Sequence, residues 1–198
     1  MKQVKLYKLT DREGQTRGAT QWGRNVTHSA SGNPDQPLCS DAWIHAYTSP
    51  LLAVLLNPAH AAFVNPQLWE AKGVIGITDG LKVGCPELTT VKRIRLPRVN
   101  RRQKVAFGIL CALEVYKEPL YMKWAKNWLS AKNRNPGAYA AYAASNAAYA
   151  AANAAHAAAA AHAAYAAYAA YAAYAAAYAA ATSASIDFVK IARKALRY

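Results

Sequence analysis

The chain has 198 residues, 54% of them hydrophobic, and a formal net charge of +14, which is enough for one domain with an appendage and favours acidic partners. Its cysteines, Cys39, Cys85 and Cys111, are widely spaced with no CxxC pair, so neither a disulfide scaffold nor a zinc site is predicted. No apolar core of signal-peptide length follows the N-terminus, and regularly spaced tyrosines make the run 163–181 a poor bilayer segment. We expect a cytoplasmic protein without a membrane segment.

Residues 1–104 predict an α+β domain with a small mixed sheet and short helices. Alternating apolar residues predict a strand over 2–9, and residues 11–37 read as loops with a short strand near 21–26. A second strand, rich in aromatic residues, is expected over 38–47.

A short buried helix is expected next. Ser49 can cap it and Pro50 suits its first position. Residues 51–56 are apolar on every side, and Asn57 with Pro58 is expected to end the helix, with a further helical turn compatible with residues 59–63.

Three more strands complete the domain. Residues 67–73 and 80–85 read as strands around a glycine-containing turn, and residues 87–96 give the clearest strand. Strict alternation would place Thr90, Lys92, Ile94 and Leu96 on one face of that strand, with Val91, Arg93 and Arg95 on the other.

Two amphipathic helices are expected over residues 105–132. The first, over 102–117, carries Ala106, Ile109, Leu110 and Leu113 at helical spacing, and the second, over 120–131, places Trp124 and Trp128 on one face with Tyr121 beside them. Residues 133–137 then read as a linker.

Residues 138–181 form an alanine-rich tract without Pro or Gly, which predicts helix. The residues other than alanine fall mostly at every third position, with an occasional fourth, and from His162 to Tyr174 the spacing is strictly three. Since three residues turn an α-helix through only about 300°, the rings move around a straight helix. The helix must therefore curl, tighten locally or find neighbours on several sides.

We interpret this tract as an interaction element that packs against its own chain, a sister copy or another protein, which allows a homo-oligomer. A bare spacer and a membrane contact are the alternatives. Its contact residues would be Tyr139, Tyr142, Tyr149, Tyr165, Tyr168, Tyr171, Tyr174 and Tyr178.

A last amphipathic helix is expected within residues 185–198. Hydroxyl residues over 182–185 precede it, and Asp187 suits its first turn. We expect this helix to fold back through Val189, Ala192 and Leu196.

The strongest charge feature runs from residue 92 to residue 104, where seven cations occur without an acid. Its members are Lys92, Arg93, Arg95, Arg98, Arg101, Arg102 and Lys104. This pattern is typical of a contact with phosphates of a nucleic acid or another polyanion. The alternative is a set of solvated charges that keep an edge strand from pairing with another sheet.

Catalytic patterns are weaker. His45 shares a strand face with Asp41, but no nucleophile-elbow glycines accompany Ser40, so a structural histidine is favoured. His45 before Glu70 also fits an ADP-ribosyltransferase-like order. His156 and His162 lie on different helix faces, and GxxxxGK[ST], GxGxxG and HExxH are absent from the sequence, so no metal or cofactor is predicted.

A family resemblance can be read in three segments, residues 40–47 with the downstream Pro50, residues 68–71, and residues 80–85. They resemble an uncharacterised small-protein family of tailed phages and prophages whose members often carry a trailing alanine-rich repeat. The resemblance covers about residues 1–130 and implies a phage or prophage origin, hence a bacterial host cell. It supplies no catalytic residues.

Three functional hypotheses follow. The first is a non-enzymatic, phage-related binding or assembly protein that uses the Ala/Tyr helix. The second is a nucleic-acid-binding protein that uses residues 92–104. The third is a small transferase built on the N-terminal domain.

Overall fold

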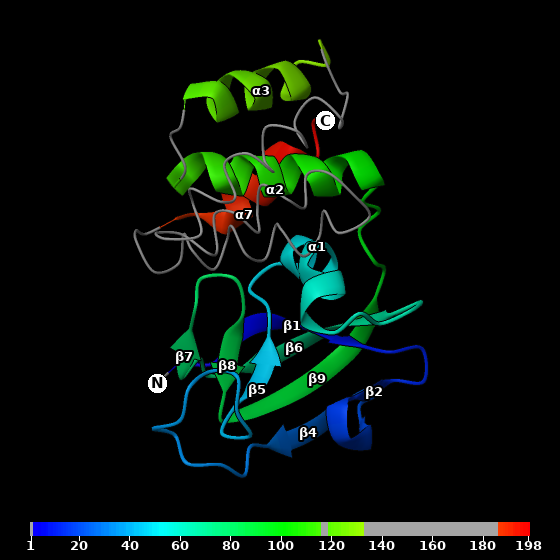
Figure 1. Ribbon diagram of the computed structural model, residues 1–198. Helices are drawn as coiled ribbons and strands as arrows, with labels where there is room; N and C mark the ends of the chain where they lie inside the picture. Colours follow the sequence, from blue (N-terminus) through cyan, green and yellow to red (C-terminus); the bar gives the residue numbers. More distant parts are fainter. Residues whose placement is uncertain (1, 116–118, 133–185) are drawn as a thin grey trace. The chain divides into compact units, whose positions relative to one another are not determined.

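The computed structural model describes residues 2–115, 119–132 and 186–198. The chain divides into two compact units, Met1–Arg98 and Val99–Tyr198. The strands lie in the first unit together with helix α1, and the described part of the second unit is helical (Figure 1). The α+β class expected from the sequence is therefore confirmed.

A four-stranded antiparallel sheet organises the first unit, in the order β1-β6-β9-β4. Its strands are β1 (Val4–Thr10), β6 (Gln67–Gly73), β9 (Glu87–Ile94) and β4 (Val26–Ser29). The predictions for β1, β6 and β9 are confirmed to within two residues at each end, because apolar alternation and the flanking proline and glycine residues marked them. Strand β4 begins where the predicted strand at 21–26 ends.

The pairing of β6 with β9 is irregular, and this overturns one prediction. The register passes from Glu70 opposite Lys92 to Ala71 opposite Thr90, so Val91 is an extra residue in β9. Because this bulge interrupts the alternation, Thr90 and Lys92 do not share a face as predicted. Thr90 is fully buried, with its hydroxyl donating to the carbonyls of Gly23 and Val26 at 2.6 and 3.1 Å, whereas Lys92 is exposed.

A smaller sheet has the order β5-β8-β7, with β5 at Ile44–Ala46, β8 at Val83–Cys85 and β7 at Ile77–Thr78. The strand expected over 38–47 is thus much shorter. Ser40 explains the difference, because its hydroxyl donates to the Pro37 carbonyl at 2.7 Å and accepts from the Ala42 amide at 3.3 Å. These local bonds hold residues 38–42 in turns.

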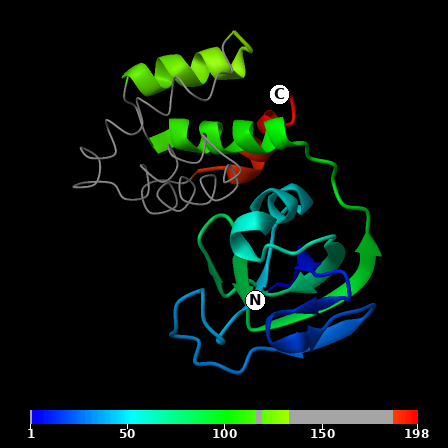
Figure 2. The same cartoon turned by 45° about the vertical axis from the view of Figure 1, so that its right-hand side comes forward.

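A hairpin of β2 (Gln15–Thr16) and β3 (Thr20–Gln21), joined by the 3₁₀ turn η1 (Arg17–Ala19), leads toward β4. Asp11 fixes its start, since its carboxylate accepts from the amides of Glu13 and Gln15 at 3.0 and 2.6 Å. Figure 2 shows this hairpin beside β4.

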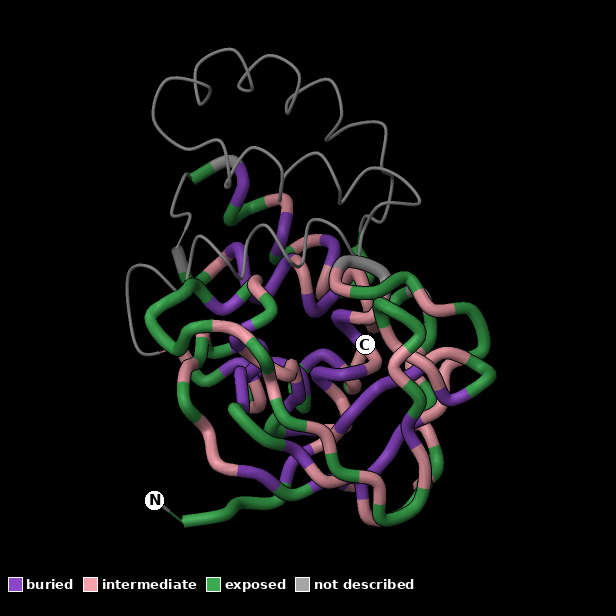
Figure 3. The backbone as a smooth tube through the Cα atoms, turned by 90° about the horizontal axis from the view of Figure 1, so that it is seen from below, coloured by how far each residue is buried: buried purple, intermediate pink, exposed green. Residues whose placement is uncertain are grey.

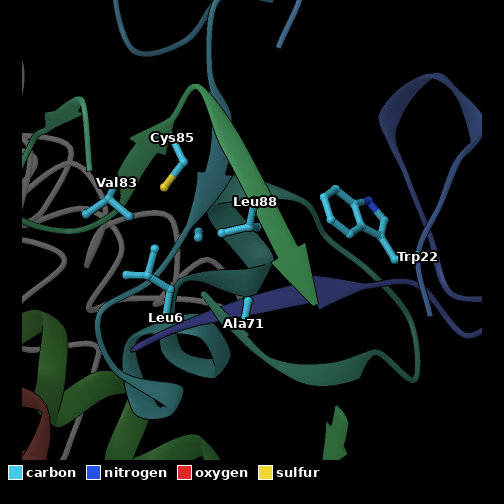
Figure 4. Packing of buried hydrophobic residues seen from close by; sticks show 7 residues of the cluster. Leu6, Trp22, Ala71, Val83, Cys85 and Leu88 are labelled. Atoms are coloured by element: carbon cyan, nitrogen blue, oxygen red, sulfur yellow. The ribbon is translucent and has the colours of Figure 1, made fainter. Parts of the chain in front are cut away.

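Both sheets and the hairpin contribute to one hydrophobic cluster. Figure 4 shows side chains from β1, β6, β8 and β9 converging, with an indole ring reaching in from the hairpin side. The cluster comprises Leu6, Trp22, Ala46, Ala71, Val83, Cys85 and Leu88. Burial of this apolar area is the main favourable term for the unit. Figure 3 shows how buried stretches alternate with exposed ones along the chain.

Helix α1 (Pro50–His60) lies beside β1 and over one side of the sheet in both Figure 1 and Figure 2. The predicted cap is confirmed, because the Ser49 hydroxyl accepts from the Leu51 amide at 3.2 Å. The predicted end at Asn57 and Pro58 is wrong. The helix continues to His60, and the Asn57 side chain closes it by bonding the amide and carbonyl of Phe63 at 3.1 and 2.9 Å.

The second unit contains α2 (Arg101–Val115), α3 (Pro119–Leu129) and α7 (Phe188–Ala195). Asn100 and Gln103 form a reciprocal capping box at the start of α2: each side chain accepts from the other's amide, at 2.9 and 3.0 Å. Helix α2 packs on both α3 and α7. Tyr121 of α3 is buried and its hydroxyl reaches the Ile109 carbonyl at 3.5 Å.

Helix α7 begins at Phe188, inside the predicted range of 185–198. Asp187 is its cap rather than a first-turn residue, and its carboxylate accepts from the Lys190 amide at 2.9 Å. The buried stripe also differs, because Val189 and Leu196 are only half-buried. Its fully buried members are Phe188, Ile191, Ala192 and Ala195.

In the described segments, no helix combines the length and apolarity needed to cross a bilayer. The predicted Ala/Tyr helix over 138–181 lies outside the described residues.

His60, which is half-buried, and the buried Tyr47 form a polar pair between α1 and the end of β5. The Tyr47 hydroxyl and His60 Nδ1 are 3.0 Å apart, and the two rings stack with centroids 5.8 Å apart. Burial, with smaller effects from Lys82 and His45, lowers the pKa of His60 to about 3. Burial also raises the pKa of Tyr47, so the hydroxyl donates to a neutral imidazole.

Lys8 is a buried cation in β1, only 8% exposed. Its ammonium donates to the His45 carbonyl at 2.8 Å and lies 4.9 Å from the centre of the Trp22 ring. Burial lowers the pKa of Lys8 to about 8, although nearby Cys85 acts in the opposite direction.

Acid should destabilise the first unit through His60. Between pH 6.5 and 3 the unfolded chain binds a proton that the folded imidazole does not, so the free energy of unfolding falls as pH falls, by about 5 kcal/mol across that window. Urea unfolding followed by tryptophan fluorescence at several pH values measures this loss. His60→Gln keeps an acceptor for Tyr47 and should flatten the plot of unfolding free energy against pH. A plot for the variant that runs parallel to the wild type would contradict the assignment of this pH dependence to His60.

Lys8 should make the stability of the first unit depend on pH at the alkaline end of the range. Between pH 8 and 10.5 the unfolded chain holds a proton that folded Lys8 has lost, so this residue makes stability rise with pH, by about 3 kcal/mol. Lys8→Met removes the contribution, whereas Lys72→Met, at an exposed position of β6, retains it. The difference between the two variants in urea midpoint should change steadily from pH 7.5 to 10.5. A constant difference would show that Lys8 does not titrate there.

Candidate polyanion interface

The structure divides the predicted basic run between the two units. Lys92 and Arg93 lie near the end of β9. Arg95 and Arg98 lie in the segment that follows. Arg101, Arg102 and Lys104 belong to the first turn of α2, in the second unit. The basic run is therefore divided between the two units, and each part is a feature of its own unit.

A groove of about 590 Å³ lies in the first unit where β6 begins and β9 ends. The ladder brings these ends together, because Leu68 pairs with Ile94 and Trp69 with Arg93. Its lining consists of Pro66, Gln67, Leu68 and residues 93–98. Apolar side chains and three arginines thus share one depression, which is called the arginine groove below.

Positive charge in the arginine groove has no local acidic counterpart. Arg93, Arg95 and Arg98 are exposed, and no Asp or Glu lines the groove. Among the described residues, Lys5 of β1 and Glu70 of β6 form an ion pair with a nitrogen–oxygen distance of 2.8 Å. The three guanidinium groups can therefore accept an external anion without first breaking an ion pair within the described chain.

Lys92 does not belong to the groove. It lies opposite Glu70 in the ladder and is not among the residues that line the groove. Lys5, and to a smaller extent Lys92, lower the pKa of Glu70. Alternation along the sequence already separated Lys92 from Arg93 and Arg95, and the bulge changes only its relation to Thr90.

The edge-strand interpretation also has a structural basis. Strand β4 pairs with β9 only from Glu87 to Thr90. Beyond Thr90, the described chain supplies no strand along that side of β9. Charges on such an edge oppose pairing with another sheet, so the groove arginines can serve that purpose as well.

The second unit carries a basic face that the sequence reasoning did not single out. On α7, four exposed cations recur at i, i+3, i+4 and i+7, opposite the buried stripe. They are Lys190, Arg193, Lys194 and Arg197. This spacing is visible in the sequence, because residues three and four apart are neighbours on one helix face.

The start of α2 adjoins the end of α7. The Gln103 side chain donates to the Leu196 carbonyl at 2.9 Å. Arg102 and Lys104 flank Gln103, while Arg197 follows Leu196. The first turn of α2 therefore lies against the last turn of α7, and the cations of these two helices are together called the α2/α7 basic face below.

The residues of the transferase hypothesis do not share a site. His45 Nε2 contacts the Leu38 carbonyl, so that nitrogen carries the proton and donates. Burial is the largest effect on His45 and lowers its pKa. Glu70 instead pairs with Lys5 on the sheet surface, and none of the described contacts joins it to His45.

Two other predictions concern metals and the tyrosine tract. Across residues 2–115, 119–132 and 186–198, no group of three His, Cys, Asp or Glu side chains is placed to hold a metal ion. The eight tyrosines from Tyr139 to Tyr178 and the histidines His156 and His162 lie outside the described residues, so their roles stay predictions.

Comparison with known proteins adds no relative. No family model, curated protein or solved structure matches this chain. The charges and contacts of the described residues are therefore the grounds for a functional proposal.

Proposed function

We propose that this chain is a non-enzymatic binding protein that contacts the phosphate backbone of nucleic acid through the arginine groove and the α2/α7 basic face. The observation that carries the proposal is the groove, in which three exposed arginines and no carboxylate surround a volume of about 590 Å³.

Arginine suits this partner for a geometric reason. Its planar guanidinium presents paired donors that match two oxygens of one phosphate, and it is more weakly hydrated than an ammonium. Ile94, Leu96 and Pro97 between the arginines offer apolar contact to sugars but no base-reading donors. We therefore expect binding that depends on charge far more than on sequence.

Salt dependence measures the size of the contact. The three groove arginines and the four cations of α7 make seven charges; if each neutralised one phosphate, log K against log salt would have a slope of about −6 on duplex DNA. A smaller slope would indicate that only one of the two surfaces is used at a time.

The Ala/Tyr tract and the phage origin remain part of this proposal. Their support is the sequence pattern and the resemblance of residues 1–130 to a phage family. In that setting, the tract would hold copies of the chain or a partner protein together, while the basic surfaces contact nucleic acid.

Removing the groove charges should weaken binding and reduce its salt dependence. In Arg93→Gln/Arg95→Gln/Arg98→Gln we expect the salt slope on a 30-base-pair duplex to become shallower by about three, because each lost phosphate contact releases one counterion fewer. Fluorescence anisotropy titrations between 50 and 200 mM salt measure this change.

The matched control removes three exposed cations elsewhere in the same unit, with Arg17→Gln/Arg24→Gln/Lys72→Gln. It should change the slope by about one or less, since long-range charge alone is largely screened at these salt concentrations. Equal losses in the two variants would refute the groove as the contact, and loss of binding in neither would refute nucleic-acid binding through it.

The edge-strand interpretation predicts a different result for the same variants. If the groove arginines only protect β9, the triple Gln variant should keep its affinity for DNA but form larger particles in dynamic light scattering. The control should stay unchanged in size.

A further inference from the structure

A cysteine and a lysine meet at the surface of the first unit, away from the arginine groove. The Lys82 ammonium donates to Cys39 Sγ at 3.0 Å. Cys39 is exposed and lies in the turn-rich segment before β5, and Lys82 directly precedes β8.

Lys82 is nearly buried, with 6% of its surface exposed, yet it has no carboxylate partner. Within the described chain, no Asp or Glu oxygen lies within ion-pair distance of its ammonium. A buried charge without a compensating anion is costly. The Lys82 ammonium donates to the Cys39 sulfur. It therefore stabilises negative charge that develops on that sulfur.

The backbone on both sides holds the pair in place. Asp79 accepts from the amides of Leu81 and Lys82 at 2.9 and 2.8 Å, and the Thr78 hydroxyl donates to the Lys82 carbonyl at 2.9 Å. On the cysteine side, His45 binds the Leu38 carbonyl. The short approach of nitrogen to sulfur is therefore imposed by two anchored turns.

Close packing at Gly84 reinforces this arrangement. A Cβ added to Gly84 would lie 2.8 Å from a Leu38 methyl group and 2.9 Å from Cβ of Trp43. The loop that carries Cys39 therefore packs directly against β8 at Gly84, which is close in sequence to Lys82. A larger residue at position 84 would push the loop away.

We propose that Cys39 and Lys82 form a peroxide-reactive thiol site, with Cys39 as the oxidised residue and Lys82 as its positioning residue. The thiolate sulfur attacks one oxygen of a hydroperoxide, the S–O bond forms and the O–O bond breaks. The departing oxygen takes a proton from solvent and leaves as water or an alcohol. Sulfur loses two electrons to the peroxide and becomes a sulfenic acid.

The other two cysteines provide internal references. Cys85 and Cys111 are fully buried. Burial raises the pKa of Cys85 to about 11 and also raises the pKa of Cys111, so both remain thiols at neutral pH. Oxidation should therefore be confined to Cys39 in the folded chain.

The test uses the reduced full-length protein at pH 7.4 with hydrogen peroxide and dimedone, which traps sulfenic acid. Mass spectrometry of the peptides gives a rate for each cysteine. We expect Cys39 to react about tenfold or more faster in the native protein than in the same protein unfolded in urea, because unfolding separates it from Lys82. A native rate no higher than the unfolded rate would overturn the proposal.

Variants then assign the effect to the ammonium. Lys82→Met should lower the native rate by about tenfold, Lys82→Arg should retain most of it, and the exposed control Lys72→Met should leave it unchanged. An unchanged rate in a folded Lys82→Met protein would refute the role of Lys82. If that variant does not fold, the comparison of native and unfolded wild type still decides the outcome.

Discussion

Strand β6 is hydrogen-bonded along both edges, to β1 on one side and to β9 on the other, and the first unit depends on this double pairing. It brings the residues of the hydrophobic cluster together from distant parts of the chain. It also sets the position of the arginine groove, which opens where β6 begins and β9 ends. The bulge at Val91 then places Lys92, opposite Glu70, on the other face of β9 from the buried Thr90.

Cations occupy two contrasting environments in this protein. Those of the arginine groove and of α7 are exposed and lack carboxylate partners in the described chain. Lys8 and Lys82 are buried. The Lys8 ammonium contacts a carbonyl and an indole ring, and the Lys82 ammonium contacts a thiol sulfur. Since an apolar side chain would fill the same volume as Lys82 at lower cost, its contact with Cys39 is better explained by chemistry than by stability.

Local signals predicted much of the fold. Ser49 and Pro50 marked the start of α1, because a capping hydroxyl and a fixed φ favour a helix there. Apolar alternation with a closing glycine predicted β6 at its observed bounds. The failures have tertiary or side-chain causes. Asn57 carries α1 past Pro58 by bonding Phe63, and Ser40 holds residues 38–42 in turns where alternation suggested a strand.

The sequence by itself determined the composition of the candidate sites: an acid-free run of cations, a basic helix face at regular spacing, and a set of cysteines without a pairing pattern. Only the tertiary structure decided their partners. It placed Arg93 and Arg98 with Pro66, set Lys92 opposite Glu70, and brought Lys82 to Cys39, which lies 43 positions away. The physical reason is that strand register and a bulge act through long-range pairing, whereas composition and periodicity record only local preference.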